Sequence, residues 1–214
     1  MWQNEPATLA AEHAELTHKS PGRLLLGIGI GHPEATGGYS RPLSTMRDFF
    51  DGLDAADTPV PRDERCSAAL GPKMLDLSAE RSLGAHSYFT PVQHTRFARE
   101  RVGAHALVAP ELACVLDPDA DRARATAREY AAVYLSLRNY TSNLLRFGFT
   151  DDDIARGGSD ELIDAIIPHG TADEIAKVAR AHLEAGADHV CLQPVGVSGI
   201  PREEWTVLAA ALDL

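Results

Sequence analysis

Residues 24–30 read Leu-Leu-Leu-Gly-Ile-Gly-Ile, a continuous apolar run with glycine at positions 27 and 29. A short run without polar alternation is typical of a parallel strand that is covered on both faces. Similar runs recur along the chain, and each is separated from the next by a segment with helical periodicity. The predicted strands are 24–30, 66–70, 85–89, 107–116 and 189–195. This alternation predicts an α/β fold with a parallel sheet.

The segments between these runs carry start signals for helices. Proline suits the first turn of a helix, because the amide that it lacks would have no helical acceptor there, and Pro6, Pro42 and Pro72 each open a helical pattern. Thr171 and Glu174 form a capping box. The predicted helices are 6–16, 42–56, 72–81, 90–101, 119–135, 171–186 and 201–212.

The pattern between residues 138 and 168 is the least regular part of the chain, and its apolar positions predict a small helical insertion. We expect residues 1–214 to form a single domain, because no repeat or low-complexity tract interrupts them. About five strands suffice for an open, doubly wound sheet, whereas a parallel barrel needs about eight. The strand pattern alone therefore leaves an open sheet and an incomplete barrel as alternatives.

Composition excludes several classes of partner. The chain has a formal net charge of −11, which argues against binding to nucleic acid or to an anionic membrane surface. No apolar run approaches the roughly 20 residues of a membrane span, and residues 1–6 do not resemble a signal peptide. Cys66, Cys114 and Cys191 lie in apolar runs without C-x-x-C spacing, which indicates reduced thiols. We expect a cytoplasmic protein that binds a small molecule.

Ligands of parallel α/β proteins bind at the carboxyl ends of the strands. The first such end, Gly27 to His32, is not a dinucleotide fingerprint, because His32 or Glu34 occupies the place of the final glycine. It is not a Walker loop either, since no Gly-Lys-Ser/Thr follows. Alternating glycines let a flat ligand approach the backbone, or they make room for a neighbouring helix, and both interpretations stay open.

The second strand end reads Ala68-Ala69-Leu70-Gly71-Pro72-Lys73-Met74. Small residues end the strand, a glycine turn follows and a helix begins, so the amides of the helix start could bind a phosphate or another anion. Lys73 could add a positive charge there, although a single lysine in a first helical turn is commonly a solvated surface residue.

The third strand end is Gly84 to Thr90, where His86 could donate a proton and Tyr88 or Phe89 could stack on a ligand. A lone histidine on an apolar strand is more often a packed core residue. The sequence contains no H-E-x-x-H or H-x-H metal motif and no G-x-S-x-G elbow. Metal-dependent and serine-dependent hydrolysis therefore have no support.

Together these segments resemble the luciferase-like family of flavin- or deazaflavin (F420)-dependent oxidoreductases, over essentially the whole chain and in order. The stretches that carry the resemblance are Pro6 to Ala10, Gly22 to His32, Tyr39 to Leu43, Leu53 to Ala55, Ala68 to Met74, Asn139 to Phe149 and Ala185 to Val190. The resemblance implies a parallel (β/α)₈ barrel with the cofactor at the carboxyl ends of the strands. It places the predicted strands fourth to eighth, so the first three strand units would be lacking.

The resemblance also implies roles for residues at these strand ends. Gly29, Gly31 and His32 would border the cofactor ring, and Ala68, Ala69, Gly71, Pro72 and Lys73 would hold the ring edge and the phosphate tail. Ser87, Tyr88 and Thr90 would lie near the same tail. His32 and His86 are the candidates for proton transfer, because histidine ionises near neutral pH.

The function implied is hydride transfer or monooxygenation of a small organic substrate with F420 or FMN, between which the sequence does not choose. An apolar edge strand at 24–30 invites association, so we expect a homodimer that covers it. One alternative is a non-catalytic, flavin-binding or structural relic, since a pocket that lacks one wall would lose much of its catalytic power. The other is a truncated gene product of a complete barrel enzyme.

Overall fold

The computed structural model describes residues 4–34, 37 and 39–214. The chain is organised as two compact units. The first contains the residues up to His86 together with Glu100–Leu107, and the second contains Ser87–Arg99 and Val108–Leu214. The single domain expected for residues 1–214 stays a prediction.

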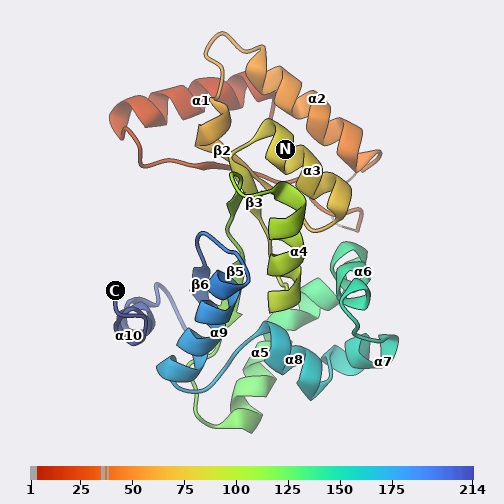
Figure 1. Ribbon diagram of the computed structural model, residues 1–214, viewed down its shortest axis with the longest axis vertical. Helices are drawn as coiled ribbons and strands as arrows, with labels where there is room; N and C mark the ends of the chain where they lie inside the picture. The colour runs from red at the N-terminus through yellow and green to blue at the C-terminus, as the bar shows by residue number, and fades with distance from the viewer. Residues whose placement is uncertain (1–3, 35–36, 38) are drawn as a thin grey trace. The chain divides into compact units, whose positions relative to one another are not determined.

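A parallel sheet runs through the first unit (Figure 1). Its strands are β1 Leu26–Ile28, β2 Arg65–Ala68 and β3 Gly84–His86, and β4 Leu107–Val108 follows β3 in the strand order. Leu26 pairs with Arg65, and Ala68 pairs with His86. Gly84 allows a close approach of two backbones, because a Cβ atom there would lie 2.0 Å from the carbonyl oxygen of Leu107.

Three helices pack on one face of this sheet. They are α1 Pro6–Lys19, α2 Pro42–Asp54 and α3 Pro72–Arg81, and the 3-10 helix η1 Arg62–Glu64 precedes β2. Each of the three α-helices has proline in its first turn, as predicted. The core between helices and strands consists of Ala10, Ile28, Met46, Phe49, Phe50, Leu53, Val60 and Leu77.

Arg65 is a buried arginine that ties β2 to two helix ends. Its side chain is 3% exposed, and its guanidinium group donates to the carbonyl oxygens of Arg81 at 2.9 Å and Val60 at 3.1 Å. It also pairs with Asp54 at 2.7 Å and lies 5.0 Å from the centre of the Phe50 ring. Burial opposes the ionisation of Asp54, but hydrogen bonds from Arg81 and Arg65 outweigh it and hold the pKa of Asp54 below its ordinary value.

Replacing Arg65 should therefore cost much more stability than replacing a surface arginine. We expect Arg65→Ala to lower the free energy of unfolding by about 3 kcal/mol, because two carbonyl groups lose their donor and a cavity forms. The matched control is Arg47→Ala, since Arg47 and Glu80 pair at 3.1 Å with both side chains about half exposed. This control should cost less than about 1 kcal/mol. Equal midpoints of the two variants in urea would contradict the interpretation.

The second unit contains a two-stranded parallel sheet of β5 Glu111–Cys114 and β6 Cys191–Pro194, in which Glu111 lies opposite Cys191. α4 Val92–Val102 begins in this unit and ends in the first one. The remaining helices, all in the second unit, are α5 Ala120–Leu135, α6 Arg138–Arg146, α7 Asp151–Ile154, η2 Ala155–Gly157, α8 Asp160–Ile166, α9 Ala172–Glu184 and α10 Arg202–Ala211. The capping box of Thr171 and Glu174 forms at the start of α9, as predicted.

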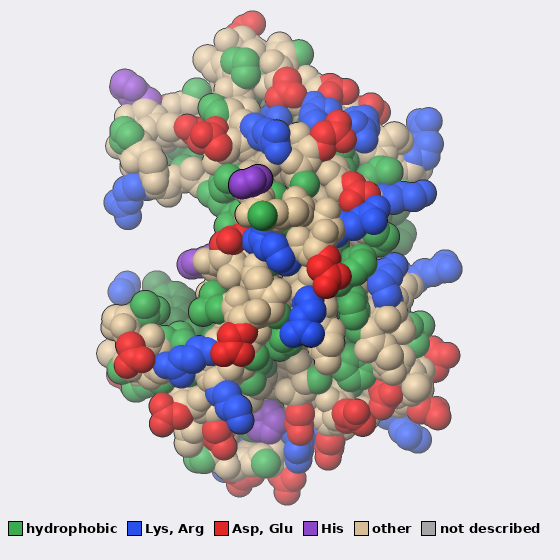
Figure 2. Space-filling view, viewed as in Figure 1, with side chains coloured by type: hydrophobic (Ala, Val, Ile, Leu, Met, Phe, Trp, Pro, Cys, Tyr) green, Lys and Arg blue, Asp and Glu red, His purple; other side chains and the backbone are tan. Residues whose placement is uncertain are grey.

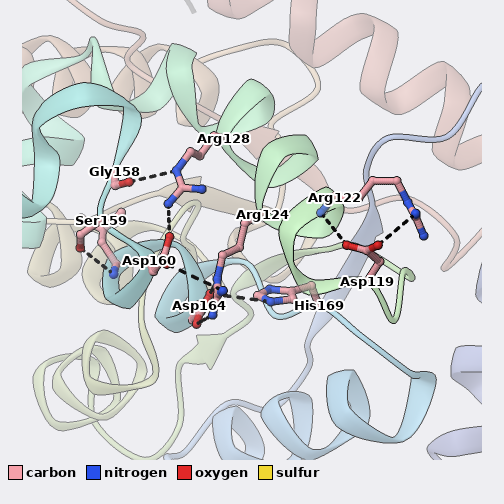
Figure 3. Close-up of polar contacts among 10 residues, drawn as sticks. Asp119, Arg122, Arg124, Arg128, Gly158, Ser159, Asp160, Asp164 and His169 are labelled. Atoms are coloured by element: carbon pink, nitrogen blue, oxygen red, sulfur yellow. Dashed lines mark hydrogen bonds and ion pairs between the residues drawn. The ribbon is translucent and has the colours of Figure 1, made fainter.

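Ion pairs join α5 to α8 (Figure 3). Arg124 donates to both carboxylate oxygens of Asp164, at 2.8 and 2.6 Å. Arg128 pairs with Asp160 and donates to the carbonyl oxygen of Gly158 at 3.1 Å, and the hydrogen bond from Arg128 lowers the pKa of Asp160. Acidic and basic side chains also occur together over the face of the molecule seen in Figure 2.

The structure confirms an α/β fold with parallel sheets, but its strands differ from the predicted set. The run 107–116, predicted as one strand, is divided at Ala109-Pro110, so the described residues form six short strands rather than about five. Pro110 has no amide hydrogen to donate to a ladder, and the chain changes from one sheet to the other at this point. None of the described helices has the length and apolar character needed to cross a lipid bilayer.

Candidate functional site

Helices cover one face of the sheet of the first unit. The opposite face carries a row of mostly small residues. Leu26, Ile28 and Ile30 pack into the core with α1, α2 and α3. Because side chains alternate along a strand, Gly27 and Gly29 belong to the opposite face. The register places Cys66 beside Gly27, and His86 beside Ala68. Gly27, Gly29, Ala68 and His86 thus form a row at the carboxyl ends of β1, β2 and β3, which we call the small-residue row.

Little side-chain volume stands over this row. Among the residues that the structure describes, a Cβ atom at Gly27 would meet nothing within 4 Å, and one at Gly29 would meet only the Cβ atom of Ala68, at 3.7 Å. Ala68 is exposed, and His86 is half-buried. The row therefore leaves the backbone accessible to a flat ligand. Of the two interpretations that the sequence left open for these glycines, this geometry favours the ligand, because the helices pack on the other face.

The loop after β1 continues beyond the row. Gly31 has a positive φ of 73°, a conformation that a residue with a side chain adopts only with strain, and His32 next to it is half-buried. The structure places His32 in this loop and His86 on β3, so the two predicted proton-transfer residues belong to different strand ends.

The second predicted segment forms the start of α3. Gly71, Pro72 and Lys73 line a hollow of about 340 Å³ together with Pro42, Leu43 and Met74. The amides of Met74 and Leu75 donate to the carbonyl oxygen of Gly71, and Pro72 has no amide hydrogen. Among the first-turn amides of α3, the one at Lys73 is thus left without an acceptor in the helix. This helix start therefore offers an anion fewer backbone donors than the sequence suggested. An anion bound here would depend mainly on the Lys73 amide and ammonium groups. Ala69, just before this segment, is buried.

Ser87, Tyr88 and Thr90 lie in a short irregular segment with a bend at Phe89, directly after β3 in the second unit, which we call the Ser87–Thr90 turn. Ser87 and Thr90 are buried and Tyr88 is half-buried. Phe89, between them, has a φ of 53°, an uncommon conformation for a residue with a bulky side chain. The hydroxyl oxygen of Thr90 is buried without a hydrogen-bond partner among the described residues. A buried hydroxyl without a partner is costly, which makes it a candidate to bond a ligand.

Glu111 holds this turn from β5. Its backbone amide donates to the carbonyl oxygen of Ser87 at 2.8 Å, and its carboxylate accepts from the amide of Phe89 at 3.4 Å. Tyr130 donates to the other carboxylate oxygen at 3.3 Å, and its hydroxyl lies 2.9 Å from that of Tyr134. The Phe89 ring stacks on Tyr134 with centroids 4.7 Å apart. Glu111, together with these two tyrosines, forms what we call the Glu111 clamp.

Burial raises the pKa of Glu111 to about 7, and the hydrogen bonds from Phe89 and Tyr130 only partly oppose that shift. Sequence reasoning missed this residue, because a single glutamate in a strand-like run has no partner visible nearby in the sequence. One weak signal was present: Glu111 is the only charged residue between Leu107 and Leu116. No cluster of potential metal ligands occurs among the described residues.

The raised pKa predicts a pH dependence of stability. The folded state keeps a proton on Glu111 that the unfolded state loses above the ordinary value of 4.5, so wild-type stability should fall as the pH rises from about 4.5 to about 7. Glu111→Gln cannot ionise. We expect the stability of wild type relative to Glu111→Gln to fall by on the order of 3 kcal/mol between pH 4 and pH 8 in urea unfolding. A difference that stays constant with pH would refute this.

Comparison with known proteins identifies the chain at the level of family. The sequence profile described as luciferase-like monooxygenase matches residues 1–189. The chain belongs to this luciferase-like family. Its parallel α/β architecture agrees with that assignment. Among curated proteins, none matches the chain closely enough to count as a relative.

Three solved structures illustrate the likeness of fold. An F420-dependent secondary alcohol dehydrogenase, solved with an F420–acetone adduct, has a TM-score of 0.65 and 18% identity, over 87% of this chain and 68% of that one. The coenzyme F420-dependent tetrahydromethanopterin reductase from Methanopyrus kandleri has a TM-score of 0.63 and 16% identity, and the match covers 99% of this chain and 79% of that one. The third structure is the oxygenating constituent of 3,6-diketocamphane monooxygenase from Pseudomonas putida, a type II Baeyer–Villiger enzyme solved with FMN. It has a TM-score of 0.62 and 17% identity, and the match covers 97% of this chain and 74% of that one.

Proposed function

We propose that this luciferase-like chain is an oxidoreductase that uses reduced F420 or FMN for hydride transfer to, or monooxygenation of, a small organic substrate. The observation that carries the proposal is the small-residue row, where Gly27, Gly29 and Ala68 leave room for a ring against the backbone. Membership of the family supports it. F420 and FMN are the cofactors named for the solved neighbours, and both contain a flat fused ring.

Taken one at a time, each unit contains residues that suit part of such a cofactor. In the first unit, the small-residue row, together with Gly31 and His32 in the loop after β1, would border the ring, and the buried Ala69 after β2 would lie near the ring edge. Gly71, Pro72 and Lys73 supply an amide and an ammonium group for a phosphate tail. In the second unit, the Thr90 hydroxyl lacks a partner among the described residues and suits a polar atom of the tail, with Ser87 and Tyr88 as its neighbours in the turn.

The bound cofactor supplies the hydride or the oxygen-activating ring. The protein residues bind it, orient it and keep water away. His32 and His86 are the candidates for exchanging a proton with the substrate, since each lies at a strand end where the row or its loop would border the ring.

Titration of the purified chain with F420 and, separately, with FMN tests the proposal. The cofactor fluorescence should change on binding, with a dissociation constant in the micromolar range for one of the two. Turnover of the reduced cofactor then separates an enzyme from a non-catalytic binding protein. Absence of binding by both cofactors would overturn the proposed function.

A substitution on the small-residue row should weaken binding without unfolding the protein. Ala68→Leu places a larger side chain on an exposed position where the ring would lie, so we expect affinity to fall about tenfold or more with an unchanged unfolding temperature. Ala7→Leu is the matched control, because Ala7 is an exposed alanine of α1 in the same unit. Equal affinity of the two variants would place the ring elsewhere.

We also propose that β1, β2, β3, β4 together with β5, and β6 correspond to the fourth to eighth strands of a family barrel, and that two copies associate along β1. β1 is the edge of its sheet, and Leu25 beside it is 41% exposed. An exposed apolar edge is stabilised when another chain covers it. Light scattering at micromolar concentration should give twice the chain mass, and Leu25→Lys should shift the mass toward that of a monomer. A monodisperse wild-type monomer would overturn the dimer.

A further inference from the structure

The Glu111 clamp contains a buried carboxyl group that the proposed function does not use. Glu111 is 3% exposed. It makes hydrogen bonds with the Ser87–Thr90 turn and with the phenol of Tyr130. A buried carboxyl is costly, and apolar residues could fill a strand position of this kind more cheaply. Its contacts therefore call for an explanation beyond packing.

The turn itself needs support. Phe89 adopts a positive φ of 53°, a strained conformation for a residue with a Cβ atom. Two contacts compensate for this strain: the amide of Phe89 donates to the Glu111 carboxylate at 3.4 Å, and the Phe89 ring stacks on Tyr134. The same glutamate holds Ser87 through its backbone amide, at 2.8 Å. One residue of β5 thus fixes two positions of the turn, Ser87 and Phe89.

We propose that Glu111 is a positioning residue, whose ionised carboxylate holds the Phe89 amide and thereby keeps Ser87, Tyr88 and Thr90 in the arrangement that binds the cofactor tail. This inference rests on the proposed function. A carboxylate accepts an amide hydrogen more strongly than a carboxylic acid or an amide does, so ionisation of Glu111 tightens the turn.

Several titratable groups of the described residues interact with Glu111. They are the phenols of Tyr130, Tyr134 and Tyr140 from α5 and α6, and the thiols of Cys114 and Cys191 from β5 and β6. Burial is the largest of the causes that raise the pKa of each of these groups, so none of them ionises near neutral pH. Glu111 is thus the group of this cluster whose charge changes there.

The first experiment needs no cofactor. In protein labelled with ¹⁵N-phenylalanine, the Phe89 amide peak is assigned by its loss in Phe89→Tyr. We expect this peak to shift with a midpoint near pH 7 in wild type and in the control Glu129→Gln, which alters an exposed glutamate of α5. The shift should vanish in Glu111→Gln. In Tyr130→Phe the midpoint should rise, because a hydrogen bond that stabilises the carboxylate is lost. A Phe89 peak that is insensitive to pH in wild type would overturn the proposal.

The second experiment measures affinity for FMN or F420 between pH 5.5 and pH 8.5. Relative to Glu111→Gln at the same pH, wild type and Glu129→Gln should bind about three- to tenfold more tightly above the midpoint than below it. Ionisation of a cofactor phosphate affects all variants alike, so the comparison isolates Glu111. Equal pH profiles for wild type and Glu111→Gln would overturn the positioning role.

The two experiments separate the two proposals. If wild type binds neither cofactor at any pH, the proposed function fails, and the tail-binding role of the turn fails with it. The labelled-amide titration still decides whether Glu111 holds the turn. If binding occurs but does not follow the midpoint of the Phe89 peak, the proposed function stands and Glu111 is not a positioning residue.

Discussion

Parallel pairing is the constraint on which the rest of this structure depends. Parallel neighbours must be joined by a crossover, so helices or long connections separate the strands, and within each sheet all carboxyl ends meet at one edge. Pairing also puts register partners on the same face, which brings Ala68 beside His86 although 18 positions separate them in the sequence. The small-residue row follows from that register, while Arg65 on the other face ties the strand layer to the ends of α2 and α3.

Most of the fold could be predicted, because its signals are local. Apolar runs located the strands, prolines marked the starts of α1, α2 and α3, and the capping box of Thr171 and Glu174 marked α9. Strand ends were less predictable. The division of run 107–116 depends on which partner each half meets, and periodicity within one segment carries no such information. Pro110 was the available sign, because proline inside a run argues against an uninterrupted strand.

The candidate site was predictable only in part. Small residues at strand ends can be read from sequence, and the structure places Gly29, Ala68 and His86 in one row. The roles assigned to them stay predictions. Glu111 could not be found in advance, since its partners Phe89 and Tyr130 lie 22 and 19 positions away and its burial depends on the packing of α5. The same holds for Arg65, which looks like an ordinary charged residue until its burial is known.

Individual charged groups of this protein differ in their sensitivity to dissolved ions. The pairs between α5 and α8 involve side chains that water reaches, with Asp160 63% and Asp164 39% exposed. Mobile counter-ions screen such pairs, since the Debye length falls from about 8 Å at physiological ionic strength to about 3 Å in molar salt. The Arg65 guanidinium group is buried, and two of its acceptors are uncharged backbone carbonyl groups, although its partner Asp54 is 47% exposed. Concentrated salt should therefore weaken the contacts between α5 and α8 more than it weakens the attachment of β2, so the salt concentration around this protein determines how firmly α8 is held.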